Sequence, residues 1–127
     1  MGLQLKVEQM PGYLAARFIG VGVAEDVWRQ FNFIAEHCNR TKNNKLLIDT
    51  AEAEFKVSLA ERFLAVEEAR VFARYRLKVA VVTKPERLDP QRFGETVARN
   101  RGVNISAFTN VEDAEKWLLK RPPEAAA

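Results

Sequence analysis

The residues best suited to chemistry in this 127-residue chain stand where three apolar runs end. Asp49 and Thr50 follow one run, Thr83 and Lys84 follow a second, and Thr109 follows a third. In open α/β sheets, ligands bind outside the carboxyl ends of the strands. These five residues, called here the strand-end rim, could therefore hold a small polar or phosphorylated ligand. The same residue types also terminate strands and cap helices, so both interpretations stay open at this point.

A second candidate is the hydroxyl of Ser58. The segment 58–61 has the pattern Ser-x-x-Glu of a capping box, which predicts that Ser58 is the N-cap of a helix. A phosphate on this residue would meet free backbone N–H groups and the positive end of the helix dipole. Ser58 is thus a predicted cap and also a candidate phosphoacceptor, and capping alone accounts for its presence.

Catalytic and metal-binding patterns are absent from the sequence. His37 and Cys38 are the only residues of their types, and neighbours on a helix point about 100° apart. Such a pair cannot supply the four ligands of a structural zinc site. The chain also has no nucleophile elbow, phosphate-binding loop or dinucleotide fingerprint. We therefore expect no catalytic residue, no metal and no cofactor, and we expect a protein that is not an enzyme.

Composition narrows the class of protein further. The formal net charge is only +3, from 20 basic and 17 acidic residues that alternate along the chain, which does not favour nucleic-acid binding. No apolar run approaches the roughly 18 residues of a membrane span, and the N-terminal segment lacks the apolar part of a signal peptide. A single cysteine fits a reducing compartment. The expected location is the cytoplasm.

Strand and helix periodicities alternate along the chain. The predicted strands cover residues 3–8, 13–19, 45–50, 77–83 and 103–108, and the predicted helices cover residues 24–39, 58–76, 90–101 and 111–121. This order, β-β-α-β-α-β-α-β-α, predicts an α/β fold with a mostly parallel five-stranded sheet and an N-terminal antiparallel hairpin. We expect one domain over residues 1–121 and a disordered tail over residues 122–127.

The helix predicted from Ser58 has two apolar stripes. One stripe suits the core, and the second lies roughly 120–160° further round the helix. A helix of this kind is either buried on two sides or available to a partner. The residues predicted to form a partner face are Leu64, Val71, Tyr75 and Arg74.

Several segments resemble the STAS domain, the fold of bacterial anti-sigma-factor antagonists, and more closely the stand-alone STAS/Sec14-like proteins of bacteria. The segments are the opening hairpin, LLIDTAEAEF, SLAERF, LKVAVV and ISAFTNVEDAEKWL. STAS switches carry Asp-Ser-Ser/Thr-Gly at the start of the second helix and are phosphorylated on the hydroxyl before the glycine. Here these positions hold Val57, Ser58, Leu59 and Ala60, so only Ser58 matches and the acceptor position is a leucine.

The resemblance implies a non-enzymatic regulatory or binding module. The partner-binding helix of the family corresponds to the helix that begins at Ser58, which implies a protein partner or a second copy of the chain in a homodimer. The Sec14-like relatives imply instead an apolar or lipid ligand, and an anionic ligand at the strand-end rim is the further alternative. We expect the protein-binding module that acts through the helix from Ser58, and we keep the small-ligand-binding protein as the alternative.

Overall fold

The computed structural model of the protein describes residues 2–87 and 93–120. The strands are β1 (Leu3–Met10), β2 (Tyr13–Val23), β3 (Lys45–Lys56), β4 (Lys78–Val82) and β5 (Asn104–Phe108). The helices are α1 (Ala24–Arg40), α2 (Leu59–Glu68), α3 (Arg70–Arg74), the short 3₁₀ helix η1 (Pro85–Arg87), α4 (Phe93–Asn100) and α5 (Val111–Leu119). The predicted helix start at residue 90, the domain boundary at 121 and the tail 122–127 lie outside the described residues.

The strands form one sheet in the order β1-β2-β3-β4-β5. β1 and β2 are antiparallel, and each later pair of neighbours is parallel. Gly12 has a φ of 86°, a conformation that glycine adopts without strain, and it lets a two-residue turn connect Met10 to its partner Tyr13. The predicted mixed sheet with an opening hairpin is confirmed.

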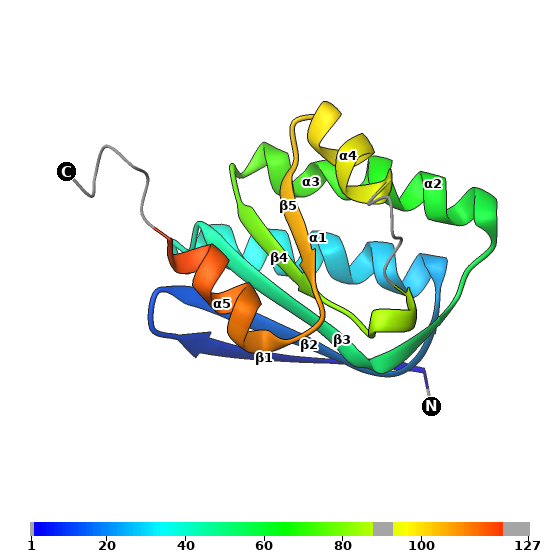
Figure 1. Cartoon of the computed structure of the whole chain (residues 1–127), viewed down its shortest axis with the longest axis horizontal. Coiled ribbons are helices and arrows are strands. Elements are labelled where there is room, and N and C mark those ends of the chain that lie inside the picture. The colour runs from blue at the N-terminus through cyan, green and yellow to red at the C-terminus, as the bar shows by residue number, and fades with distance from the viewer. Residues whose placement is uncertain (1, 88–92, 121–127) are drawn as a thin grey trace.

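Helices cover both faces of this sheet. Side chains from α1, α3 and α4 pack on one face around Leu46 and Ile48, and α5 packs on the other face around Leu47. Figure 1 shows α5 in front of the strands and α1 behind them. Successive residues of a strand point to opposite faces, so the apolar run of β3 supplies both cores.

The central strand is longer than the sequence predicted. Residues 51–56 were expected to form a loop, yet they continue β3 and pair with β2 as far as Lys56 and Val23. Their alternation explains this: Ala53 is buried while Glu52 and Glu54 are exposed. Because β4 ends at Val82, opposite Asp49, the last part of β3 extends beyond β4.

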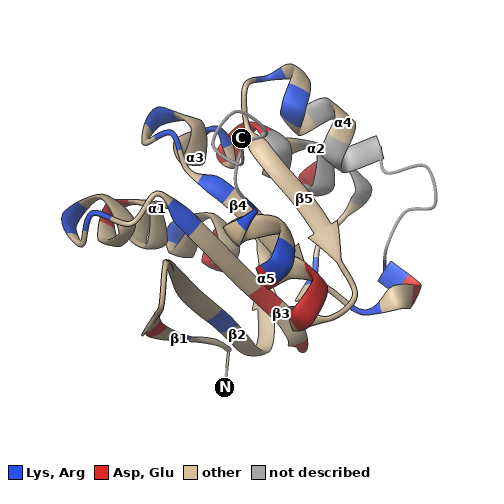
Figure 2. Cartoon of the chain, turned by 60° about the vertical axis from the view of Figure 1, so that its left-hand side comes forward, with Lys and Arg blue, Asp and Glu red and all other residues tan. Residues whose placement is uncertain are grey.

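The predicted helix 58–76 is divided at Ala69 into α2 and α3. Phe72 of α3 is 1% exposed and packs against Phe31 of α1, with ring centroids 5.2 Å apart. No helix in the described residues is long and apolar enough to cross a bilayer. Basic and acidic residues are spread over many of the strands and helices (Figure 2).

Candidate functional site

Ser58 caps α2 as predicted. Its hydroxyl accepts a hydrogen bond from the Glu61 backbone N–H at 3.1 Å, and the Glu61 carboxylate accepts one from the Ser58 N–H at 2.8 Å. Two of the unpaired N–H groups at the start of the helix are therefore satisfied within the chain. Ser58 is exposed, so its hydroxyl is open to modification, but a phosphate there would lie beside the Glu61 carboxylate.

Leu64 is the most exposed of the large apolar side chains described on the helices, with 51% of its surface open to solvent. It lies on α2, two turns after the cap. Leucine side chains of this kind occur singly on many surfaces, so exposure alone has limited weight. The groove that begins one turn later on α2 gives the exposure of Leu64 more weight.

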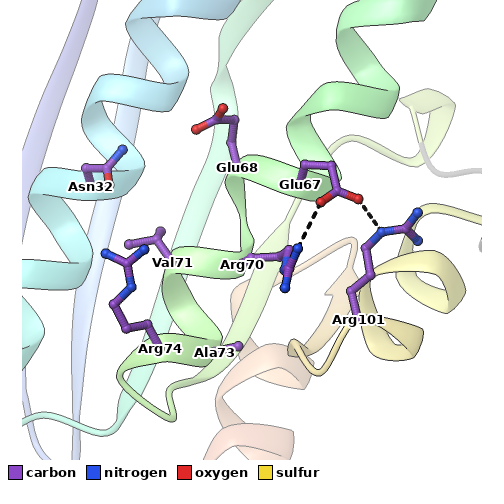
Figure 3. Close-up of a pocket in the computed structure, with 8 residues that line it drawn as sticks. All are labelled: Asn32, Glu67, Glu68, Arg70, Val71, Ala73, Arg74 and Arg101. Atoms are coloured by element: carbon purple, nitrogen blue, oxygen red, sulfur yellow. Dashed lines mark hydrogen bonds and ion pairs between the residues drawn. The ribbon is translucent and has the colours of Figure 1, made fainter.

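An open groove of about 620 Å³ lies between α1, α2, α3 and the end of α4, and we call it the arginine groove. Figure 3 shows its lining residues. They are Asn32, Glu67, Glu68, Arg70, Val71, Ala73, Arg74 and Arg101. Three guanidinium groups and two carboxylates thus converge beside α2.

Glu67 forms ion pairs with two of these cations. Its carboxylate pairs with Arg70 at 3.3 Å and with Arg101 through a close hydrogen bond (Figure 3). The hydrogen bond from Arg101 is the main reason that the pKa of Glu67 is lowered. Arg74 is exposed and has no hydrogen-bond or ion-pair partner in the part of the chain that the structure describes, so its charge can be offered to an acidic group outside the chain.

The predicted partner face is wrong in one respect. Val71 is 7% exposed and belongs to the core, and Tyr75 is half-buried and packs against that core. The division at Ala69 separates the turn that carries Val71 from α2, so positions 64 and 71 no longer lie on one continuous helix. Leu64 and Arg74 are the two predicted face residues that are exposed.

The strand-end rim is also different from expectation. Thr50 is 7% exposed, and its hydroxyl donates a hydrogen bond of 2.8 Å to the Val82 carbonyl. Asp49 accepts a hydrogen bond of 3.0 Å from the Ala51 N–H and lies 4.0 Å from Arg17. Both residues stand within β3 and not at its end, and the Thr50 hydroxyl is committed to the fold.

The other rim residues follow β4 and β5 and lie closer to solvent. The Thr83 N–H donates to the Phe108 carbonyl at 2.9 Å, which brings the ends of these two strands together. Lys84 and Thr109 are exposed. Asp49 lines a separate groove of about 660 Å³ beside α5, in which no other rim residue takes part. The five residues therefore do not converge on one ligand position.

Arg87 was missed at the sequence level. From η1 its guanidinium donates to the Thr50 carbonyl at 3.1 Å and also to the Ala53 carbonyl, both on the part of β3 near and beyond the end of β4. It therefore satisfies carbonyl groups on the edge of β3 where β4 no longer pairs with it. A strand that extends beyond its neighbour leaves carbonyl groups that need a donor. The sequence did not predict Arg87 as that donor, because the predicted strand ended at residue 50 and β3 ends at Lys56.

Metal binding and thiol chemistry find no support here. Within residues 2–87 and 93–120, no three histidine, cysteine or acidic side chains are grouped so that they could hold a metal ion. His37 stacks on Phe33, with ring centroids 6.0 Å apart. Cys38 is fully buried, and this burial raises the pKa of its thiol to about 11, which keeps it protonated and unreactive near neutral pH.

Solved structures share this architecture. An uncharacterised protein of the DUF3478 family from Shewanella loihica, described as having a SpoIIAA-like fold, matches with a TM-score of 0.57 and 22% identity over 92% of this chain and 94% of its own. An anti-sigma factor antagonist from Mycobacterium paratuberculosis matches with a TM-score of 0.58 and 12% identity over 93% and 95% of the two chains. The fold is SpoIIAA-like.

The anti-sigma factor antagonist SpoIIAA in its unphosphorylated form has the same SpoIIAA-like fold, with a TM-score of 0.53 and 11% identity over 90% of this chain and 97% of its own. No family model and no curated relative matches the sequence. The fold that the STAS resemblance implied is confirmed, because these structures are those of anti-sigma-factor antagonists and of a SpoIIAA-like protein.

Proposed function

We propose that this protein is a non-enzymatic regulatory module that binds a protein partner through α2 and the adjoining arginine groove. The observation that carries the proposal is the half-exposed Leu64 on α2, one turn before the groove residue Glu68, together with Arg74 of α3, which lines the same groove and has no bonded partner in the described residues. Two proteins of the same fold are anti-sigma factor antagonists, a name that denotes action on another protein. This supports a regulatory role for the SpoIIAA-like fold here.

The chemistry of this surface suits a protein partner. Interfaces combine a central apolar contact with polar groups at the rim, and arginine is enriched in them. Leu64 supplies the apolar contact, and Arg74 supplies a charge that bonds in a bidentate manner to a carboxylate. The partner expected from these features has an apolar pocket next to an aspartate or glutamate.

Site-specific photo-crosslinking in cells that naturally make the protein tests this proposal. A benzophenone amino acid at position 64 is expected to give a covalent adduct with one protein, identified by mass spectrometry. The control carries the same group at Val111, which is similarly exposed at 44% but lies on α5, on the other face of the sheet. Equal adducts from both positions, or none from position 64, would refute the α2 surface.

Ser58 gives this proposal a means of regulation. Phosphorylation would add about two negative charges at the start of the partner-binding helix, beside Glu61. We expect phosphorylated Ser58 in protein isolated from cells, and weaker partner binding by Ser58→Asp than by Ser58→Ala. Protein that is unmodified under all growth conditions, or equal binding by the two variants, would count against the switch.

A second candidate function is binding of a small amphiphilic or anionic ligand beside α5. The groove there is lined by apolar side chains that include Ala15, Leu47 and Val111, and by two cations and two carboxylates, which are Lys6, Arg17, Glu8 and Asp49. A raised melting temperature with one class in a panel of lipids and nucleotides would support this function. The matched variant Arg17→Gln should lose the shift if the ligand is anionic, and no shift across the panel would remove this candidate.

A further inference from the structure

The outer edge of β1 is an unpaired strand edge. β1 is the first strand of the sheet and pairs with β2 alone. In the described residues, no backbone hydrogen bond outside the sheet involves residues 3–9, and no arginine or lysine side chain is bonded to that edge. Such an edge is a template for pairing with another strand.

Two other edges of the sheet are capped by arginine side chains. At β5 the Phe108 carbonyl points to β4, where it accepts the Thr83 N–H, so by alternation the Ile105 carbonyl points outward. Arg99 donates to that carbonyl at 3.1 Å. On the part of β3 that extends beyond β4, Arg87 donates hydrogen bonds to the Thr50 and Ala53 carbonyls. Each of these two edges is thus covered by its own arginine side chain. In the described residues, the outer edge of β1 has no such cover.

The charges on β1 are complementary to those on β1 of a second, antiparallel copy. Lys6 and Glu8 are exposed and point to the same face of the sheet, on either side of Val7. If two copies of β1 pair antiparallel about Val7, Lys6 of each copy stands directly opposite Glu8 of the other. A shift of two residues between the strands, which moves the centre of the pairing to Lys6 or to Glu8, places lysine opposite lysine or glutamate opposite glutamate, which is destabilising. The charge pattern therefore selects one register.

An exposed aromatic ring lies on the helix that packs against β1 and β2. Phe31 of α1 packs against Phe72 of α3, and Phe33 lies about 200° further round the helix, on the side away from α3. Phe33 is 46% exposed, and α1 lies against β1 and β2. In Figure 2, α1 and β1 run along the same side of the molecule. A second copy paired on β1 would bring its own α1 to this ring.

We propose that β1 pairs with β1 of a second copy of this chain, antiparallel and centred on Val7, so that two five-stranded sheets join into one continuous sheet. A lysine in an edge strand ordinarily discourages such pairing, and here Glu8 of the other copy neutralises it. The pairing uses a surface distinct from α2 and does not depend on the proposed function.

Charge reversal tests the pairing and its register together. Lys6→Glu and Glu8→Lys each replace two opposite-charge pairs by two like-charge pairs, so each variant alone should dimerise about tenfold or more weakly. In an equimolar mixture of the two variants, every acidic position of one chain again faces a lysine of the other. The mixture should therefore form a heterodimer, measured by sedimentation equilibrium and native mass spectrometry at low salt.

Two control variants make the test specific. Lys56→Glu carries the same change of charge at an exposed position on β3 and should leave the wild-type association unchanged, as should Leu64→Glu on α2. Circular dichroism establishes that each variant is folded. A wild type that is monomeric at all concentrations, a mixture that stays monomeric, or a dimer that Leu64→Glu dissociates while the charge reversals do not, would each overturn the proposal.

Discussion

Tyr13 ties the opening hairpin to the last helix. Its side chain is 2% exposed, and its hydroxyl donates a hydrogen bond of 2.6 Å to the Glu115 carboxylate on α5. Burial, and then this hydrogen bond, raise the pKa of Tyr13 from 10.0 to about 12. Lys78 joins β4 to the same helix. Its ammonium donates to the Trp117 carbonyl at 2.7 Å and lies 4.5 Å from the centre of the Trp117 ring.

The raised pKa gives a definite pH dependence of stability. Because the folded-state pKa of Tyr13 lies above its unfolded value, the stabilisation is fully present below pH 10 and is lost as the pH rises from 10 towards 12. The loss over that interval is about 2 kcal/mol. Urea unfolding of wild type and Tyr13→Phe between pH 8 and pH 11 measures the first part of this loss, about 1 kcal/mol.

Tyr13→Phe should be about 1 kcal/mol less stable than wild type at pH 8 and should approach it as the pH rises. A constant difference between the two proteins across that range would mean that the Tyr13 hydroxyl does not titrate as its surroundings require.

At this scale the sequence predicted some residues and not others. The Ser58 cap was predictable because a capping box depends on residues three apart. The burial and bonding of the Thr50 hydroxyl could not be predicted, because its partner is the carbonyl of Val82, which is 32 residues away in the chain. The Tyr13–Glu115 bond joins residues that are further apart still, so no local pattern marks it.

At the scale of elements, local periodicity determined most of the fold. The order of strands and helices was predicted because apolar residues recur every second residue in β1 and at helical spacing in α1. Two boundaries were wrong for tertiary reasons. The chain divides at Ala69, where no glycine or proline marks a break, and the packing of Phe72 against Phe31 places α3 instead. The end of β3 depends on its pairing with β2.

The capping box should contribute to the stability of α2. Ser58→Ala removes the acceptor for the Glu61 N–H and is expected to lower the free energy of unfolding by about 1 kcal/mol. Ser58→Asp preserves an acceptor at the N-cap and should be close to wild type. Urea denaturation of the three proteins decides this, and an unchanged stability in Ser58→Ala would show that α2 does not depend on its cap.

Arg87 should hold the last part of β3 in place. Arg87→Ala leaves the Thr50 and Ala53 carbonyls without their guanidinium donor, so amides of residues 51–56 are expected to exchange with solvent about tenfold faster or more. Arg74→Ala, which removes an exposed arginine without a bonded partner in the described residues, is the control. Hydrogen-exchange mass spectrometry gives the comparison, and equal exchange in the two variants would contradict the role of Arg87.

At the scale of the whole molecule, the two proposed interaction surfaces lie on different elements. β1 is at one edge of the sheet, and Figure 1 shows α2 and α3 at the opposite side of the molecule from β1. A dimer formed at β1 would therefore leave both copies of α2 open and would present two partner-binding helices at once. Such a bivalent module would bind a dimeric partner more tightly than a single chain does.

The central claim is that α2 recognises a protein partner through Leu64. The measurement that tests it most directly is the affinity of the partner captured at position 64 for purified wild type, Leu64→Glu and Val111→Glu. We expect Leu64→Glu to weaken binding about tenfold or more, because a charge would replace a desolvated apolar contact, and we expect Val111→Glu to bind as wild type does. Equal affinity of the partner for wild type and Leu64→Glu would contradict the claim.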